Sequence, residues 1–153
     1  MLTKANNVRR IALAFPSAMM ASESLMHGIL DFARKRGGWS FTRIPEQLDP
    51  SPEWLREWRG DGAFAVVTTA EMVRLVRGLS FPVVNLMGYV PRLTIPTATL
   101  DHYGIGRLQA EHLLERHFRR LAYYGVSDLW FGRERLRGFE DASKEAGATV
   151  TPW

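Results

Sequence analysis

Cysteine is absent from this sequence of 153 residues. Without a thiol, the chain has no disulfide scaffold, no thiolate metal site and no cysteine nucleophile. Long apolar runs are missing as well, because the first one, Ile11 to Phe15, ends after five residues at Pro16. A secretory signal needs about seven or more consecutive apolar residues, and a membrane span needs about eighteen. We therefore expect a cytoplasmic protein with no signal peptide and no membrane segment.

Lysine is scarce, since 17 of the 20 basic residues are arginines and only 3 are lysines. Together with 16 acidic residues they give a formal net charge of +4. The arginines occur as separate pairs, such as Arg9 with Arg10 and Arg119 with Arg120, and not as a continuous stripe. A nucleic-acid-binding face requires a clustered basic surface. The charge pattern therefore gives little support for DNA binding by this chain itself.

The rest of the composition is that of a folded domain, with 46% hydrophobic, 24% charged and 11% aromatic residues. This balance excludes intrinsic disorder, and the length suits one domain or part of a larger one. Short apolar runs bounded by turn residues alternate with segments of helical spacing. The predicted strands cover 11–15, 39–44, 63–67, 82–86, 97–100 and 121–124, and the predicted helices cover 22–36, 52–58, 70–77, 103–118 and 133–145.

The alternation of strands and helices predicts an α/β fold. Continuous apolar runs at 11–15 and 63–67 are typical of strands buried on both faces, which occur in parallel sheets. The segment 39–44 alternates apolar and polar residues, which predicts a strand nearer the edge. We expect an open parallel sheet with helices on both faces and right-handed crossovers. Ligands bind such sheets outside the carboxyl ends of the strands, so those loops are the positions to examine.

Motifs for catalysis and cofactor binding are incomplete. Two glycines open the predicted helix at 103–118, but Gln109 stands where a dinucleotide fingerprint needs its third small residue. His112 and His117 are five residues apart and do not share a helix face as zinc-binding histidines do. Neither a nucleophile elbow nor a phosphate loop occurs. We predict no catalytic residue, no cofactor and no metal, and an enzyme on a flavodoxin-like or Rossmann-like sheet is the least favoured alternative.

Three polar residues near strand or helix ends leave two interpretations open. Asp101 follows the predicted strand 97–100, so its carboxylate either lies at the ligand edge of the sheet or caps the helix that follows. His102 is either a ligand residue at the same edge or a packed side chain. Arg135 is either functional or one of several arginines on a solvated helix turn.

Four short motifs, taken in order and spacing, resemble the sugar-binding domain of the lactose/galactose repressor family. They are 61–67, 100–104 leading into 111–114, 120–125 and 135–139. The resemblance covers nearly the whole chain and implies a periplasmic-binding-protein type I fold, in which two α/β lobes hold a small sugar in the cleft between them. It also implies an N-terminal tail at 1–8, a first lobe at 9–118 and the start of an incomplete second lobe at 119–153.

Within that family the sequence is most similar to the xylose-operon regulators, because only about eight residues precede the first strand. The resemblance implies that Asp101 accepts hydrogen bonds from sugar hydroxyls and that Arg135 donates them. Trp130 or Phe131 would cover the apolar face of the ring. The predicted ligand-binding residues are Asp101, Arg135, Ser17, Thr68, His102, Trp130 and Phe131.

The function implied by the resemblance is that of a sensor in a bacterial transcription regulator. A small sugar, with a xylose-like pentose favoured, would bind between the lobes and bias a homodimer. DNA would be bound by a separate domain, C-terminal to this chain and absent from it. The alternative on the same fold is a solute-binding protein of a sugar transporter.

Overall fold

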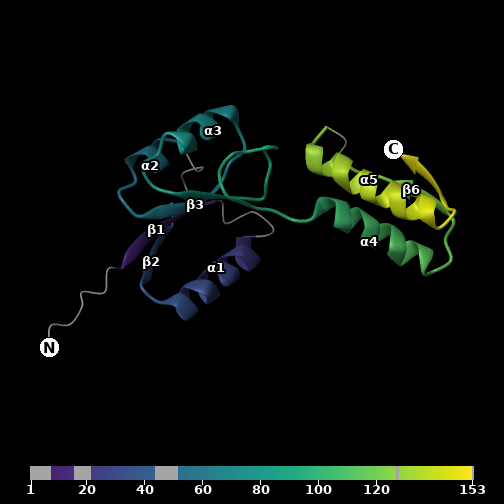
Figure 1. The fold of residues 1–153 in the computed structure, drawn as a ribbon, viewed down its shortest axis with the longest axis horizontal. Helices are drawn as coiled ribbons and strands as arrows, with labels where there is room; N and C mark the ends of the chain where they lie inside the picture. Colours follow the sequence, from purple (N-terminus) through teal and green to yellow (C-terminus); the bar gives the residue numbers. More distant parts are fainter. Residues whose placement is uncertain (1–7, 16–21, 44–51, 127, 153) are drawn as a thin grey trace. The chain divides into compact units, whose positions relative to one another are not determined.

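The chain forms two compact units, which we call the N-terminal unit, Met1–Ala98, and the C-terminal unit, Thr99–Trp153. Their structure comes from a computed structural model, which describes residues 8–15, 22–43, 52–126 and 128–152 (Figure 1). Each unit is considered by itself below. The C-terminal unit takes in part of the predicted first lobe at 9–118, and the division into lobes itself stays a prediction.

A five-stranded sheet forms the centre of the N-terminal unit. The strand order is β2-β1-β3-β4-β5, and every neighbouring pair is parallel. The predicted parallel α/β fold is thereby confirmed, and the strand with alternating residues, β2, lies at the edge as its pattern predicts. The strands are β1 (Arg9–Ala14), β2 (Trp39–Arg43), β3 (Gly62–Val66), β4 (Val83–Leu86) and β5 (Thr97–Ala98).

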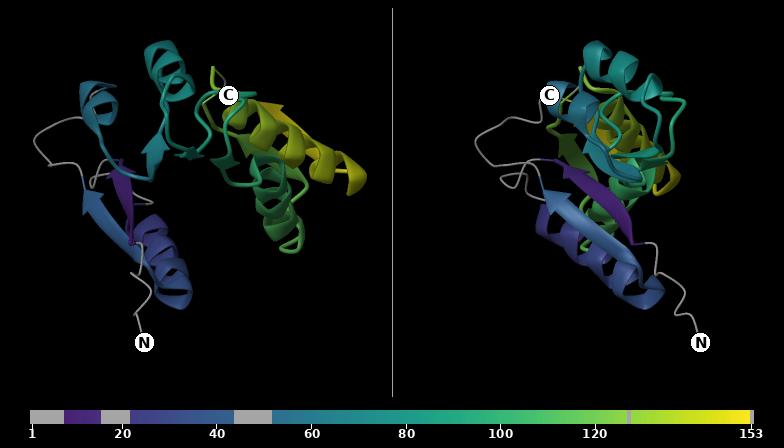
Figure 2. Two further views of the ribbon diagram at one scale, coloured as in Figure 1. Left: turned by 60° about the vertical axis from the view of Figure 1, so that its left-hand side comes forward. Right: turned by 90° about the vertical axis from the view of Figure 1, so that its left-hand side faces the viewer.

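Helices cover both faces of this sheet. The helix α1 (Ser22–Arg36) lies on one face, and α2 (Pro52–Glu57) and α3 (Ala70–Arg77) lie on the other (Figures 1 and 2). Neighbouring residues of β1 point to opposite faces, so Leu13 belongs to the core beneath α1 and Ala12 belongs to the core beneath α2 and α3. Both residues are buried, which is why β1 reads as a continuous apolar run.

The carboxyl ends of the central strands are joined by one buried amide. Asn85 of β4 is completely buried, and its Oδ1 accepts a hydrogen bond of 2.9 Å from the backbone N–H of Val67. Its Nδ2 lies 3.4 Å from Oγ1 of Thr97 in β5. A buried amide with satisfied partners fixes the spacing of the strand ends. Sequence analysis gave no signal for this bond, because it joins residues far apart in the chain.

The C-terminal unit rests on two helices packed along one another. The helices α4 (His102–Leu114) and α5 (Trp130–Glu145) lie side by side in Figure 1 and in the left view of Figure 2. They cover a pair of parallel strands, β6 (Arg120–Tyr123) and β7 (Thr149–Pro152). Four apolar residues form the core between them, namely Ala110, Leu121, Phe139 and Ala142.

Two glycines bring the helix backbones into direct contact. A Cβ atom added to Gly106 would lie 1.9 Å from the carbonyl oxygen of Arg135, and one added to Gly138 would lie 2.1 Å from that of Tyr103. Real side chains cannot occupy such positions, so glycine is required on both helices. Tyr103 then donates a hydrogen bond of 2.9 Å to the carboxylate of Asp141. Close contact and polar pairing together fix the register of α4 against α5.

The predicted boundaries of one strand and two helices are wrong. The predicted strand 97–100 is only two residues long and exposed, because β5 is an edge strand that pairs with β4 alone. The predicted helix 103–118 ends at Leu114, and His117 adopts a positive φ of 65° in the turn that follows. The helix predicted at 133–145 starts three residues earlier, since Trp130 and Phe131 are weak helix formers whose pattern hides the first turn. The strand β7 was not predicted at all.

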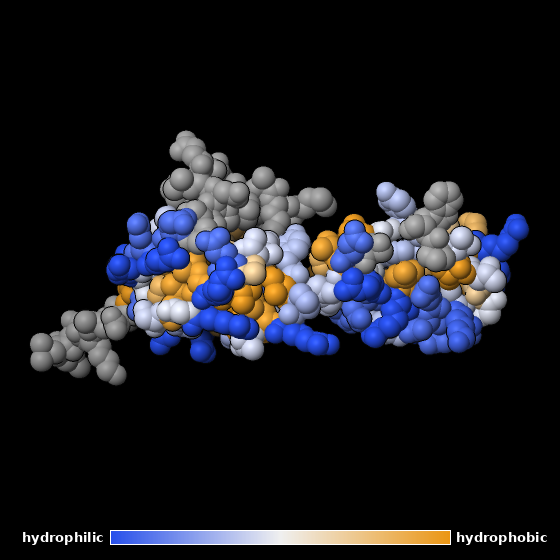
Figure 3. Space-filling model, turned by 90° about the horizontal axis from the view of Figure 1, so that it is seen from above, coloured by the Kyte–Doolittle hydropathy of each residue, from blue (hydrophilic) through white to orange (hydrophobic). Residues whose placement is uncertain are grey.

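Large apolar side chains are exposed mainly in the C-terminal unit. Figure 3 shows orange hydrophobic surface on both units, among blue hydrophilic residues. A two-stranded parallel sheet cannot cover its own faces and edges, which accounts for this exposure. Within the described ranges, no helix is long and apolar enough to cross a membrane. Among the described residues, the exposed large apolar side chains are Val8 and Phe32 in the N-terminal unit, and Leu100, Leu108, Phe118, Tyr124, Val126 and Leu129 in the C-terminal unit.

Candidate ligand-binding site

Five of the seven predicted ligand residues come from the first turn of α4, the first two turns of α5 and the residue before α4. The helices run in the same direction, because contacts advance along both: His102 meets Arg135, and Arg107 meets Glu145 further on. Both helix N-termini therefore lie at one end of the unit, where the helix dipoles favour negative charge. We call Asp101, His102, Trp130, Phe131 and Arg135 the helix-start cluster.

Asp101 is the N-cap of α4. Its Oδ1 accepts a hydrogen bond of 2.9 Å from the backbone N–H of Gly104. The capping interpretation left open by the sequence is thus confirmed. The buried strand expected before Asp101 is absent, and the residue is exposed. A carboxylate has about four acceptor sites, and we find no second hydrogen bond to it among the described residues, so it keeps acceptor capacity for a ligand.

His102 is buried, with 7% of its surface exposed. Nε of Arg135 donates to its Nδ1 over 3.2 Å, and its Nε2 lies 3.4 Å from Oγ1 of Thr99. Because Nδ1 acts as the acceptor, this network assigns the ring proton to Nε2. The ring also packs against Trp130 and Phe131, at centroid distances of 5.4 and 5.2 Å. Both ring nitrogens are therefore engaged within the protein.

The surroundings keep His102 neutral. Burial lowers the pKa of its imidazole below the usual 6.5, and the positive charge of Arg135 lowers this pKa further. The carboxylate of Asp101 raises it to a smaller extent. The lowered pKa agrees with the hydrogen-bond network, in which a neutral ring accepts at Nδ1.

Arg135 lies in the second turn of α5 and is half-buried. Its Nε is bonded to His102, and its guanidinium carbon lies 5.8 Å from the centre of the Phe131 ring. Within the described part of the chain we find no partner for the two terminal amino groups, and no ion pair joins Arg135 to Asp101. A donor fork and a carboxylate thus stand at the same end of the unit without neutralising each other.

The two aromatic residues of the cluster lie in the first turn of α5. Trp130 and Phe131 are half-buried, with ring centroids 6.2 Å apart in an edge-to-face arrangement. This position corrects the sequence-based expectation that both residues precede the helix predicted at 133–145. Helical backbone fixes the direction of their side chains more firmly than a loop does.

The other two predicted residues are not part of the helix-start cluster. Thr68 is exposed in the N-terminal unit, two residues after the end of β3 and next to Thr69. Thr69 itself caps α3, with Oγ1 3.2 Å from the backbone N–H of Met72. Ser17 lies outside the described residues. A ligand role for either residue stays a prediction.

Sequence analysis missed three residues that shape the cluster. Thr99 engages the Nε2 side of His102, and Gly106 and Gly138 set how closely the two helices approach. The glycines carry a signal that can be found, since each lies in the interior of a predicted helix, where glycine is unfavourable by about 1 kcal/mol relative to alanine. Such glycines are retained where a backbone must come close, but the partner helix cannot be deduced from them.

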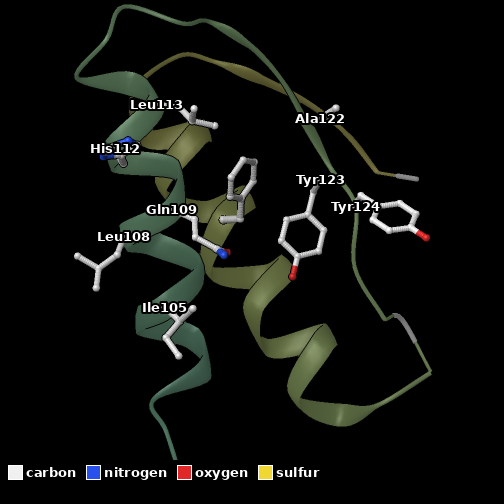
Figure 4. A pocket seen from close by; sticks show the side chains of 9 residues that line it. Ile105, Leu108, Gln109, His112, Leu113, Ala122, Tyr123 and Tyr124 are labelled. Carbon is white, nitrogen blue, oxygen red and sulfur yellow. The ribbon is translucent and has the colours of Figure 1, made fainter. Parts of the chain in front are cut away.

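A separate groove, which does not include the helix-start cluster, runs along α4. It has a volume of about 590 Å³ and is lined mostly by apolar side chains of α4 and β6. In Figure 4, Gln109 points from α4 toward Tyr123, and Tyr124 points away from the helix. None of the predicted ligand residues lines it. Among the described residues, no group of three or more histidines or carboxylates comes together that could hold a metal ion.

Comparison with known proteins identifies the fold. No family model matches the sequence, and no curated protein matches it. Solved structures do match: the transcription regulator CcpA of Lactococcus lactis has a TM-score of 0.76 at 16% identity, with 95% of this chain and 58% of that one covered. The fold is that of the type I periplasmic-binding proteins.

Two further neighbours share the type I fold. The xylose-binding transcription activator XylR has a TM-score of 0.75 at 18% identity, covering 100% of this chain and 39% of that one. A periplasmic binding protein/LacI transcriptional regulator from Alkaliphilus metalliredigens QYMF, complexed with D-xylulofuranose, has a TM-score of 0.66 at 20% identity, covering 95% and 56%. These neighbours are regulators and sugar-binding proteins, not enzymes. The chain spans less than two thirds of each, and identities this low establish the fold alone.

Proposed function

We propose that this chain is the ligand-sensing part of a sugar-responsive transcription regulator and that the helix-start cluster binds the sugar. The observation that carries the proposal is that the Arg135 fork and the Asp101 carboxylate lie at one end of the unit beside two aromatic rings. Among the described residues, neither charged group forms an ion pair. A sugar offers hydroxyl donors to the carboxylate, oxygen acceptors to the guanidinium and an apolar face to an aromatic ring. Neighbours of the same fold whose names state a sugar or a regulatory role support it.

A small neutral sugar fits the cluster better than an anion. The Asp101 carboxylate at the same end of the unit repels a bound anion, whereas the hydroxyl groups of a sugar can bond both charged groups. We propose a pentose of the xylose type, as the sequence resemblance implies. The placement of that sugar between two lobes is supported by the resemblance alone. A contribution from Ser17 and Thr68 is supported by their positions after predicted strands of a parallel sheet.

Regulation requires the sugar to favour one conformation of the receptor over another. A ligand changes such an equilibrium only by its difference in affinity for the two states. We propose that sugar binding favours one arrangement of a homodimer and so alters DNA binding by a separate domain. A cytoplasmic location follows from this role.

The proposal is tested by titrating the full-length protein with D-xylose, L-arabinose and D-ribose in a calorimeter. Wild-type protein is expected to bind at least one of the three. Replacing Arg135 by Ala removes the donor fork and is expected to weaken binding at least tenfold, since a hydrogen bond to a charged group contributes about 1.5–3 kcal/mol. Arg133→Ala is the matched control, because Arg133 lies on the same helix, is exposed and bonds the carbonyl of Asp128.

Asp101 needs a variant that separates capping from ligand binding. Asn caps helices about as well as Asp but lacks the negative charge. Asp101→Asn is therefore expected to fold normally and to lose sugar affinity about tenfold or more. Normal affinity in both Arg135→Ala and Asp101→Asn would show that the cluster is not the site.

The transporter alternative makes a different prediction for DNA. A solute-binding protein binds sugar without any effect on an operator. Measuring binding of the full-length protein to the promoter region of its own gene, with and without sugar, distinguishes the two functions. A sugar-dependent change favours the regulator, and sugar binding with no DNA binding favours the transporter component.

A further inference from the structure

His102 lies in the middle of the helix-start cluster, yet it has no ring nitrogen left for a ligand. Nδ1 accepts from Nε of Arg135 over 3.2 Å, and Nε2 lies 3.4 Å from the hydroxyl of Thr99. With 7% of its surface exposed, the side chain offers almost no area for contact. Its position therefore calls for a role other than the direct ligand contact expected from the sequence.

We propose that His102 is a positioning residue: its neutral ring holds Arg135 by Nε and leaves the two terminal amino groups of the guanidinium for the sugar. This inference rests on the proposed function, in which Arg135 donates to the ligand. The Nε–H points along one edge of the planar guanidinium, so fixing it fixes the direction of the remaining donors. His102 thus acts on the sugar through Arg135.

Arg135 has few other contacts to hold it. Within the described ranges it has no carboxylate partner, and the only other interaction of its side chain found there is with the Phe131 ring, 5.8 Å from the guanidinium carbon. A long flexible side chain that is ordered only on binding loses about 0.5–1.5 kcal/mol of binding free energy. A bond that orders the fork in advance avoids part of that loss. Removing it costs affinity even though no sugar contact is deleted.

The bond between Nδ1 of His102 and Nε of Arg135 also makes the affinity for sugar depend on pH. Protonation converts Nδ1 from an acceptor into a donor, which breaks the bond to Nε and places a second positive charge beside Arg135. The charged groups that act on the ring are Arg135 from α5 and Asp101 from the segment before α4. Thr99 and the two aromatic residues that contact the ring are uncharged. Because the pKa of His102 in the folded protein lies below the usual 6.5, we expect sugar affinity to fall as the pH drops through that lowered pKa.

Two amide variants distinguish the role of Nδ1 of His102 from the role of Nε2. The amide of Asn at position 102 reaches the place of Nδ1 and keeps an acceptor for Arg135, whereas the longer Gln reaches the place of Nε2 and loses it. With D-xylose as the first probe, and L-arabinose and D-ribose as the others, His102→Gln is expected to bind about tenfold more weakly than wild type. His102→Asn is expected to stay within about threefold and to lose the fall in affinity below pH 6.5.

The pH profile is the result that a merely structural role would not produce. An acid-side loss that persists unchanged in His102→Asn, or wild-type affinity in a folded His102→Gln, overturns the proposal. If His102→Gln fails to fold, the profile of His102→Asn decides. Circular dichroism and the thermal midpoint of each variant check folding.

A measurement made without sugar tests the positioning role of His102 separately from the proposed function. In the wild-type protein, the ¹⁵N-resolved Nε–H signal of Arg135 is expected to exchange slowly with water, and in His102→Gln to exchange rapidly. If the wild type binds none of the three sugars, the proposed function fails, and this signal still reports whether His102 holds Arg135. Equal exchange in wild type and His102→Gln would overturn the positioning role.

Discussion

The two units of the chain are stabilised by different kinds of contact. The N-terminal unit is a five-stranded sheet with an apolar core on each face, and its central strands are almost entirely buried. The C-terminal unit has two strands and a small core, and its helices are aligned by glycines and polar pairs. The pattern of apolar residues determines the fold of the N-terminal unit, and the register of α4 against α5 determines the geometry of the C-terminal unit. The helix-start cluster belongs to the second, so its geometry depends on the less regular part of the fold.

Replacing a helix glycine by alanine is expected to give the largest difference in stability between the two units. Gly106→Ala places a methyl group against the Arg135 carbonyl, where a Cβ would lie 1.9 Å away. We expect it to destabilise the C-terminal unit by about 1–3 kcal/mol and to weaken sugar binding, because Arg135 moves with its backbone. Hydrogen exchange of the α4 and α5 amides measures the local stability.

Gly28→Ala in α1 is the matched change in the N-terminal unit. Gly28 is exposed, and a Cβ there meets no atom within 4 Å. The added methyl group lowers the entropy of the unfolded chain, so we expect a stabilisation of about 0.4–1 kcal/mol. The same sign of effect at both glycines would contradict the contrast between the units.

The helix caps give the next largest effect. Thr69 caps α3 in the N-terminal unit, and Asp101 caps α4 in the C-terminal unit. Replacing either by Ala is expected to cost about 1 kcal/mol of stability, because one backbone N–H loses its acceptor. Chemical denaturation measures this loss. Only Asp101→Ala should also lower sugar affinity, and an equal loss of affinity in Thr69→Ala would mean that capping alone explains the result.

The smallest effect is the pH dependence of the C-terminal unit. The pKa of folded His102 lies below the 6.5 of an unfolded histidine, so the unfolded chain takes up its proton first as the pH falls. Stability should thus be unaffected by this group above pH 6.5 and decrease between pH 6.5 and the lowered pKa. Thermal midpoints across this range, compared with those of His102→Asn, isolate the contribution. Parallel profiles for the two proteins would show that His102 makes none.

The contrast between the units also explains what the sequence could predict. Helices α1 and α3 have the predicted bounds, 22–36 and 70–77, because caps, amphipathic spacing and terminal glycines agree there. The parallel sheet follows from its buried apolar runs. Strand β7 was missed because Thr149 and Thr151 flank a single apolar residue, and its pairing with β6 is visible only in three dimensions.

The sequence predicted which residues belong to the candidate site better than it predicted what each residue does there. The resemblance named Arg135, Trp130 and Phe131, and the position after a predicted strand named His102. The structure brings these four residues into contact. The engagement of both nitrogens of His102 could not be predicted, because it depends on the register of α4 against α5. That register follows from glycines whose partners lie about thirty residues away in sequence. Binding of a ligand by this cluster stays a prediction.

The central claim, that the helix-start cluster holds the sugar, is tested most directly by nuclear magnetic resonance. The indole N–H of Trp130 and the Nε–H of Arg135 are followed while D-xylose, L-arabinose or D-ribose is added to the full-length protein. The account predicts that both signals shift and saturate together, at the same concentration at which calorimetry shows binding. Saturable binding that leaves both signals unmoved would contradict it.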